Sequence, residues 1–175
     1  MAKQQGMRPK KGTYPTYYDN YIPLVNQEDL VVAFTQNWNE LKDLIFSVPK
    51  DKENYAYTEG KWTIKQVVIH LIDTERIFSY RALRFARKDA QQPLPYEENL
   101  YADTAELSNR TLTDLVEEFD AVRKSSLALY KSFSESTLLN SGNTAMGEAT
   151  VLSIGFATCG HAIHHMNVLK ERYLK

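Results

Sequence analysis

Residues 63–88 read TIKQVVIHLIDTERIFSYRALRFARK, the clearest helical pattern in the chain. Thr63 followed by Gln66 matches a capping box, in which each side chain satisfies a backbone N–H of the other residue. Apolar residues then recur every three or four positions, which is typical of a helix that buries one face. His70 lies at the edge of this apolar arc, and Arg81 lies within about 40° of His70 at 100° per residue. The segment therefore predicts a long helix whose apolar face carries a polar stripe, as a ligand pocket requires.

Three further segments, residues 27–48, 111–133 and 148–174, show the same spacing of apolar residues. For the first of them, Asn26 is the expected N-cap and Pro49 is the residue that ends the helix. Each segment is long enough to span a small bundle, because a helix rises about 1.5 Å per residue.

Strand-like alternation is not evident, and the residues NSGNT at 140–144 are typical of a turn. Four long helices without strands indicate an all-α four-helix bundle.

The 175 residues fit one domain, and we expect a single bundle over residues 23–175 after a flexible N-terminal arm of residues 1–22. The connection between residues 90 and 109 is unusually long, and connections of that length are usually functional.

The composition excludes several classes of function. A formal net charge of −1 and a pI near 6.4 give no basic field for nucleic acid or an anionic membrane. The longest apolar stretch, at residues 67–72, is too short to span a bilayer.

Cys159 is the one cysteine, which rules out an intrachain disulfide and favours a reducing, cytoplasmic setting. Because Cys159 points about 160° away from His161, it is interpreted as a small core or interface residue.

The distribution of histidines is the strongest functional signal. Three of the four lie in HAIHH at residues 161–165, and the fourth is His70. On a helical wheel His161 and His165 share the buried face, whereas His164 falls about 60° outside it, at the rim. Single histidines of this kind are often core residues that hydrogen-bond a neighbour. Three neutral imidazoles buried together without an ion would leave several polar nitrogens unsatisfied, so the set of three favours a metal site.

The ligand type indicates the metal and its chemistry. Three imidazoles suit Zn, Ni, Cu or Fe and disfavour Mg and Ca, and we expect Zn or Ni. Three protein ligands leave an open position, where a water or a thiolate can become the attacking group. No HExxH, CxxC, GxSxG or phosphate-binding glycine motif offers a different chemistry.

Four other residues are candidates for roles beside the metal. Glu97 or Glu98 could act as a general base, although an acidic loop is also an ordinary solvated feature. Asp73 could orient the ring of His70, or it could lie exposed. Arg81 could bind a substrate carboxylate, or it could form an ion pair with a glutamate of the bundle.

The sequence resembles the DinB-like proteins, and within them the YfiT-type branch. Three stretches carry the resemblance: YTEGKWTIKQVVIHLID at residues 57–73, PYEE at residues 95–98, and GHAIHH at residues 160–165. The likeness covers the chain from about residue 20 to its end. The family often has a polar residue three positions after the last histidine, and this chain has Val168 there.

The resemblance implies a bundle with an up-down-down-up helix order and a long crossover between its second and third helices. It implies a Ni or Zn site at the positions of His70, His161 and His165, and frequent homodimers. The implied function is that of a metal-dependent hydrolase or low-molecular-weight-thiol S-transferase on a small-molecule substrate. The alternative is a non-catalytic metal-binding or interaction bundle that works as a dimer, which a second apolar strip favours. That strip comprises Ile69, Ile72, Tyr80 and Leu83.

Overall fold

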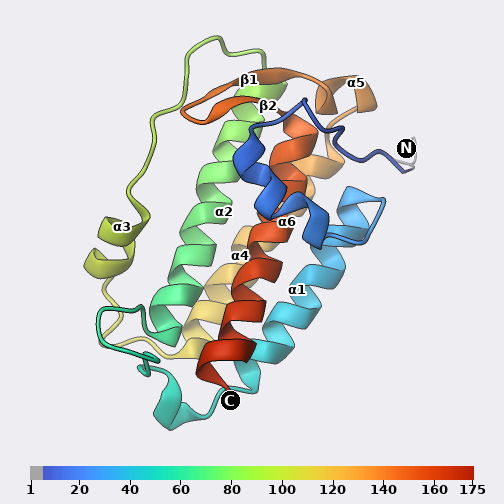
Figure 1. The fold of residues 1–175 in the computed structure, drawn as a ribbon. Helices are drawn as coiled ribbons and strands as arrows, with labels where there is room; N and C mark the ends of the chain where they lie inside the picture. Colours follow the sequence, from blue (N-terminus) through green and yellow to red (C-terminus); the bar gives the residue numbers. More distant parts are fainter. Residues whose placement is uncertain (1–5) are drawn as a thin grey trace.

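A four-helix bundle forms the body of the protein in a computed structural model that describes residues 6–175 (Figure 1). Its helices are α1 (Leu30–Phe46), α2 (Ile64–Ala86), α4 (Leu112–Lys131) and α6 (Val151–Val168). Helices α1 and α6 run in one direction and α2 and α4 in the other, which confirms the up-down-down-up order. The all-α bundle expected from the four segments is therefore confirmed.

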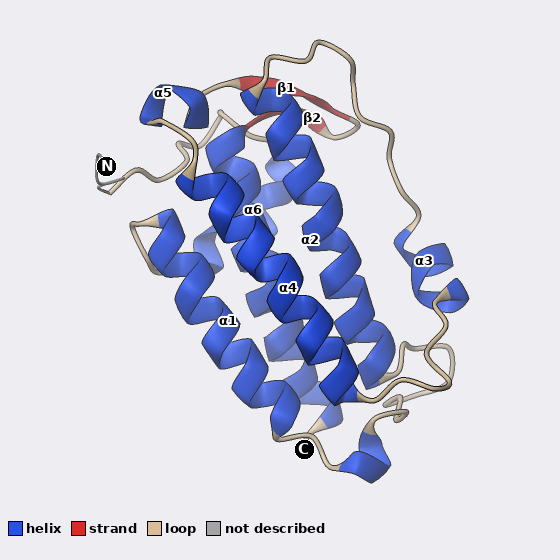
Figure 2. Ribbon diagram, turned by 180° about the vertical axis from the view of Figure 1, so that it is seen from behind, coloured by secondary structure: helices blue, strands red, loops and turns tan. Residues whose placement is uncertain are grey.

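The long connection between α2 and α4 is the crossover of this topology. Because the two helices are parallel, the chain must travel back along the whole bundle before α4 can begin (Figure 2). The short helix α3 (Glu98–Thr104) lies in the middle of the crossover. The Lys65 ammonium donates to the carbonyls of Leu107 (2.8 Å) and Arg110 (2.9 Å), which fastens the end of the crossover to the start of α2.

Side-chain caps define where the helices begin. The capping box of α2 is confirmed, because the Thr63 hydroxyl accepts from the Gln66 N–H while the Gln66 side chain accepts from the Thr63 N–H. The prediction that Asn26 caps the first helix is wrong. Asp29 caps it instead and accepts from the Val32 N–H at 2.9 Å.

A β-hairpin precedes α6, so the prediction of a chain without strands is wrong. Strands β1 (Ser141–Thr144) and β2 (Gly147–Thr150) pair antiparallel, and the stretch expected as a turn, residues 140–144, includes the whole of β1. Each strand has only four residues, too few to show alternation in sequence. The Phe85 ring lies against Gly142 where a Cβ would stand, so this contact with α2 requires glycine.

The N-terminal segment packs across α6 and includes two 3₁₀ turns, η1 (Thr16–Asn20) and η2 (Ile22–Leu24) (Figure 1). Tyr18 and Ile22 are buried in it. Arg8 donates to the backbone carbonyls of Val25 and Gln27 at 2.7 and 3.0 Å. Of the arm expected over residues 1–22, residues 1–5 lie outside the described part of the chain, and the remainder is packed on the bundle.

The remaining short elements connect or extend the main helices. They are the 3₁₀ turn η3 (Lys50–Lys52), the one-turn helix α5 (Glu135–Leu138) and the π-helical turn η4 (Leu169–Tyr173) that extends α6. None of the described helices combines the length and the apolar character that crossing a bilayer would need.

A buried ion pair lies in the middle of the bundle. The Arg123 guanidinium of α4 binds the Glu75 carboxylate of α2 at 2.7 Å, and both side chains are almost completely inaccessible to solvent. Arg123 also donates to the Asn37 side chain of α1 at 3.0 Å, and Asn37 donates to the Cys159 carbonyl of α6. This network joins all four helices. Cys159 is fully buried, as expected of a core residue, and burial raises the pKa of its thiol to about 12.

Candidate metal centre

Three histidines from two facing helices meet in the interior of the bundle, where His70 and His161 are buried. His70 lies on α2, and His161 and His165 lie one turn apart on α6. The Nε2 atoms of His70 and His161 are 3.1 Å apart. One nitrogen from each of the three rings lies within 4.8 Å of the others, so the three imidazoles could hold a single ion.

Burial keeps these imidazoles neutral. It lowers the pKa of His70 to about 4 and the pKa of His165 to about 3. Burial, reinforced by the neighbouring histidines, lowers the pKa of His161 well below its usual value. At neutral pH all three therefore have a lone pair for a ligand, which is the form that binds metal.

The hydrogen bonding of the cluster fits a cation. The Nδ1 atom of His165 is buried and has no hydrogen-bond partner among the described residues. The short contact between His70 and His161 holds at most one hydrogen bond, because a single proton occupies the space between the two nitrogens. A divalent ion would take up lone pairs that the protein leaves without a donor. Three imidazoles also match the ligands that Zn and Ni prefer.

Aromatic rings surround the three histidines. The Trp62 ring lies 4.7 Å from the His70 ring and 6.4 Å from the His165 ring, measured between centroids. The Tyr21 ring lies 5.3 Å from the His161 ring. The sequence analysis missed both contacts. Trp62 lies directly before the α2 capping box and could have been inferred, whereas nothing near Tyr21 in the sequence links it to α6.

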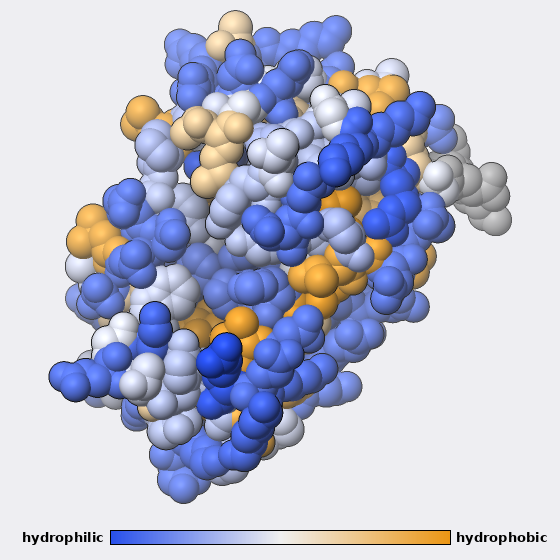
Figure 3. Space-filling view, in the orientation of Figure 1, coloured by the Kyte–Doolittle hydropathy of each residue, from blue (hydrophilic) through white to orange (hydrophobic). Residues whose placement is uncertain are grey.

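A pocket of about 300 Å³ opens onto the histidines. The hydroxyls of Thr74 and Tyr96 are 2.5 Å apart, which ties the crossover to α2 at the pocket wall. In Figure 3, surface of intermediate hydropathy, drawn pale, gathers near the middle of this face of the molecule. Such a surface is typical of small-molecule sites, where apolar walls carry a few polar groups. The aromatic wall residues are Tyr17, Tyr18, Tyr21, Trp62, Phe78 and Tyr96.

The family model that matches this chain is that of the DinB superfamily, over residues 33–169. The chain belongs to the DinB superfamily. Among solved structures it is similar to YfiT from Bacillus subtilis, described as "a probable metal-dependent hydrolase with an unusual four-helix bundle topology". The two share 15% identity and a TM-score of 0.73, over 94% of this chain and 90% of YfiT.

Two other solved structures share the fold of this DinB-superfamily protein. The mycothiol-dependent maleylpyruvate isomerase matches with a TM-score of 0.64 at 12% identity, over 79% of this chain and 58% of that chain. The colibactin self-resistance protein ClbS, in complex with a dsDNA, matches with a TM-score of 0.56 at 15% identity. The match covers 81% of this chain and 94% of the ClbS chain. A comparison with curated proteins gives no match. At these identities the likeness establishes the bundle fold.

The pocket of this DinB-superfamily chain includes three more of the residues singled out from sequence. Arg81 and Glu98 line it, and so does His164, whose side chain is exposed at its rim. Glu97, the residue that precedes α3, does not line the pocket. Of the two glutamates, Glu98 is therefore the one that shares the pocket with the histidines.

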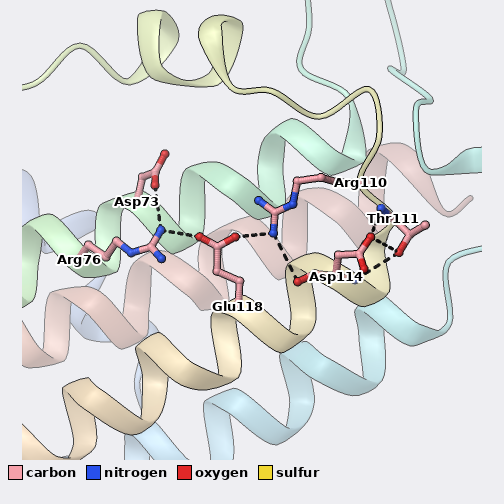
Figure 4. Close-up of polar contacts among 6 residues, drawn as sticks. All are labelled: Asp73, Arg76, Arg110, Thr111, Asp114 and Glu118. Atoms are coloured by element: carbon pink, nitrogen blue, oxygen red, sulfur yellow. Dashed lines mark hydrogen bonds and ion pairs between the residues drawn. The ribbon is translucent and has the colours of Figure 1, made fainter.

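Asp73 lies away from the histidines, in a charged network between α2 and α4 (Figure 4). Its carboxylate contacts Arg76 at 3.4 Å, and Arg76 binds Glu118 at 2.7 Å. Arg110 binds the other oxygen of Glu118. Three residues along a helix is a rotation of 300°, which turns Asp73 away from the pocket. Of the two alternatives for Asp73, the contact with His70 is not formed, and the carboxylate pairs with Arg76 instead.

Proposed function

We propose that His70, His161 and His165 bind one Ni or Zn ion and that the protein is a metal-dependent enzyme acting on a small molecule. The observation that carries the proposal is the meeting of three neutral imidazoles, with ligand nitrogens within 4.8 Å of one another, at the wall of a pocket of about 300 Å³. Membership of the DinB superfamily and the description of YfiT as a metal-dependent hydrolase support it.

A bound ion would supply Lewis acidity to a water or to a thiol at its open position. The protein itself would supply the walls and the hydrogen-bond donors of the site. Burial raises the pKa of Tyr21 far above 10 and that of Tyr96 to about 12, so both phenols keep their protons at neutral pH. Trp62 and Tyr21 would exclude water from the two sides of the histidine cluster.

Two reactions are compatible with this site. For a hydrolase, the Glu98 carboxylate at the pocket could accept the proton of the attacking water. For a transferase, the thiol would come from a low-molecular-weight cofactor, because the Cys159 thiol is in the core with a pKa of about 12. The fold shared with a mycothiol-dependent isomerase supports the second reaction.

Elemental analysis of untagged protein tests the metal. We expect about one Ni or Zn per chain in the wild type and a loss of metal in His70→Ala, His161→Ala and His165→Ala, with the helical circular dichroism unchanged. His164→Ala is the matched control and should retain the ion, because His164 is exposed and outside the three-histidine set. A wild-type protein that takes up no ion on titration with Ni or Zn would refute the proposal.

A pair of adjacent variants separates the two reactions. Glu98→Gln should abolish hydrolysis of test esters and amides if Glu98 is the base, whereas Glu97→Gln should not. Transfer of a small thiol to an electrophile such as chlorodinitrobenzene should survive in both variants. Hydrolysis that is equal in the two variants would exclude Glu98 as the base.

A non-catalytic dimer is the second candidate. Tyr80 is 54% and Leu83 is 37% exposed on the outer face of α2, which favours an additional contact there. Ile69 and Ile72, from the same strip, are already buried within the fold. Tyr80→Ser with Leu83→Ser should convert a dimer to a monomer in analytical ultracentrifugation if this surface is used.

We also propose that small molecules, rather than nucleic acids, are the partners of this chain. Its net charge of −1 supplies little attraction for phosphate backbones. Because ClbS was solved with a dsDNA, the test is direct. No shift of a labelled duplex at low salt is expected, and binding that weakens steeply with added salt would contradict this.

A further inference from the structure

Among the arginines of the described chain that are buried or partly buried, Arg81 is the one that lacks an ion-pair partner. Leaving aside the fully exposed arginines, Arg8, Arg84, Arg110 and Arg123 each lie within 4.0 Å of a carboxylate. Arg81 is half-buried, and no carboxylate of residues 6–175 lies within that distance of its guanidinium. A partly desolvated guanidinium without an anion is costly, and an anionic ligand would remove that cost.

Two contacts hold the Arg81 side chain at the pocket wall. One terminal nitrogen donates to the Leu94 carbonyl at 3.3 Å, and the guanidinium carbon lies 5.6 Å from the centre of the Phe78 ring. A guanidinium has five N–H donors in a planar fork, so most of them remain free for a ligand. The fork is therefore held in place before any ligand binds, which favours bidentate recognition of a carboxylate.

The distance from Arg81 to the histidines suits a small molecule. The Phe78 ring lies 6.4 Å from the His161 ring, and the Arg81 guanidinium carbon lies 5.6 Å from the same Phe78 ring. The guanidinium carbon and the His161 ring are therefore at most about 12 Å apart. A molecule of moderate length can bind Arg81 at one end and present its other end to the histidines.

The pocket walls between Arg81 and the histidines favour a ligand with a flat, apolar body. Tyr18, Phe78 and Tyr96 line the pocket with aromatic rings, and both Tyr18 and Phe78 are buried. Glu98 lies in the same pocket and is exposed, so a second negative group on the ligand would be repelled there. These features select a molecule with one anionic group.

We propose that Arg81 binds the carboxylate of a small monoanionic acid with a flat apolar body, whose opposite end reaches the three-histidine site. The assignment of a reacting end rests on the proposed function. The anion site itself does not, because Arg81 and the aromatic walls are present whether or not an ion is bound.

A matched pair of probes tests the proposal by calorimetric titration: 3-phenylpropanoate and its neutral amide, 3-phenylpropanamide. The wild type should bind the acid more tightly than the amide. Arg81→Gln should weaken binding of the acid by about 10- to 100-fold and that of the amide by less than about twofold. Arg87→Gln, which makes the same charge change at an exposed arginine outside the pocket, should bind both probes as the wild type does.

Two further variants distinguish the anion site from the metal site. Arg81→Lys retains the charge without the fork and should recover only part of the affinity for the acid. His70→Ala should still prefer the acid over the amide, even if no metal binds to any form of the protein. The proposal is overturned if the wild type shows no preference for the acid. It is also overturned if the preference survives Arg81→Gln but disappears in His70→Ala, because the acid would then be bound by the metal.

Discussion

The backbone carbonyl of Tyr21 lies directly against Gly160, in the space that a Cβ would occupy. The N-terminal segment therefore crosses α6 in van der Waals contact with its backbone, one residue before His161. This close approach brings the Tyr21 ring to 5.3 Å from the His161 ring and 5.8 Å from the His164 ring. A glycine next to the histidine motif thus determines where one wall of the pocket lies.

Gly160→Ala should displace the N-terminal segment and open the pocket. The added methyl overlaps backbone atoms rather than a flexible side chain, so we expect a loss of about 1–3 kcal/mol in the free energy of unfolding. Metal binding should persist, because the three histidines lie on α2 and α6. Urea denaturation and metal analysis check both expectations. The matched control on α6 is Asn167→Ala, at an exposed position, and an equal loss of stability there would contradict the argument.

The buried pair of Glu75 and Arg123 should be far more sensitive than a surface pair. Arg123→Met leaves the Glu75 carboxylate buried without a partner, which typically costs about 3–5 kcal/mol. The comparison is Lys124→Met, which breaks the exposed pair with Asp120 on the same helix and should cost far less. Both values come from urea unfolding monitored by circular dichroism. Similar losses in the two variants would show that burial of the first pair is not the cause.

The stability of the metal-free protein should fall as the pH is lowered from about 6.5 to about 4. Burial lowers the pKa of folded His70 to about 4, whereas a histidine in the unfolded chain titrates near 6.5. Between these values the unfolded chain binds more protons, so acidification favours unfolding, and the stabilisation is fully present only above the higher value. His70→Asn should make the dependence measured by thermal unfolding shallower without abolishing it, because burial also lowers the pKa values of His161 and His165. Identical curves for wild type and His70→Asn would contradict the pKa argument.

Binding of a paramagnetic ion should quench the fluorescence of Trp62. The ring of this tryptophan lies 4.7 Å from the His70 ring, close enough for Ni²⁺ or Co²⁺ at the three histidines to affect its excited state. The second tryptophan, Trp38, is buried elsewhere in the bundle, where its indole N–H binds Asp120. Titration of Trp38→Phe should therefore show strong quenching, and titration of Trp62→Phe should show little. The reverse pattern would locate the ion away from His70.

The four long helices can be predicted from the sequence alone, because each combines a repeating apolar face with residues that cap or end a helix. The box of Thr63 and Gln66 is one such local signal, and the structure retains it unchanged. The inward turn of His161 and His165, and the position of His164 at the rim, also follow from helix geometry alone. These features depend on neighbours within a few residues, so they can be read without knowledge of the fold.

Only the tertiary structure decided what lies around the histidines. Tyr21 reaches His161 across 140 residues of chain, and the hairpin that contributes Met146 to the pocket has strands too short to show a pattern. Asp73 turned toward Arg76 because α4 supplies Glu118 on that side, which no periodicity within α2 could indicate. The Glu75–Arg123 pair likewise joins two residues that are 48 positions apart in the sequence. A helix's own sequence predicts which face is buried, whereas the partner that covers that face depends on how distant segments pack together.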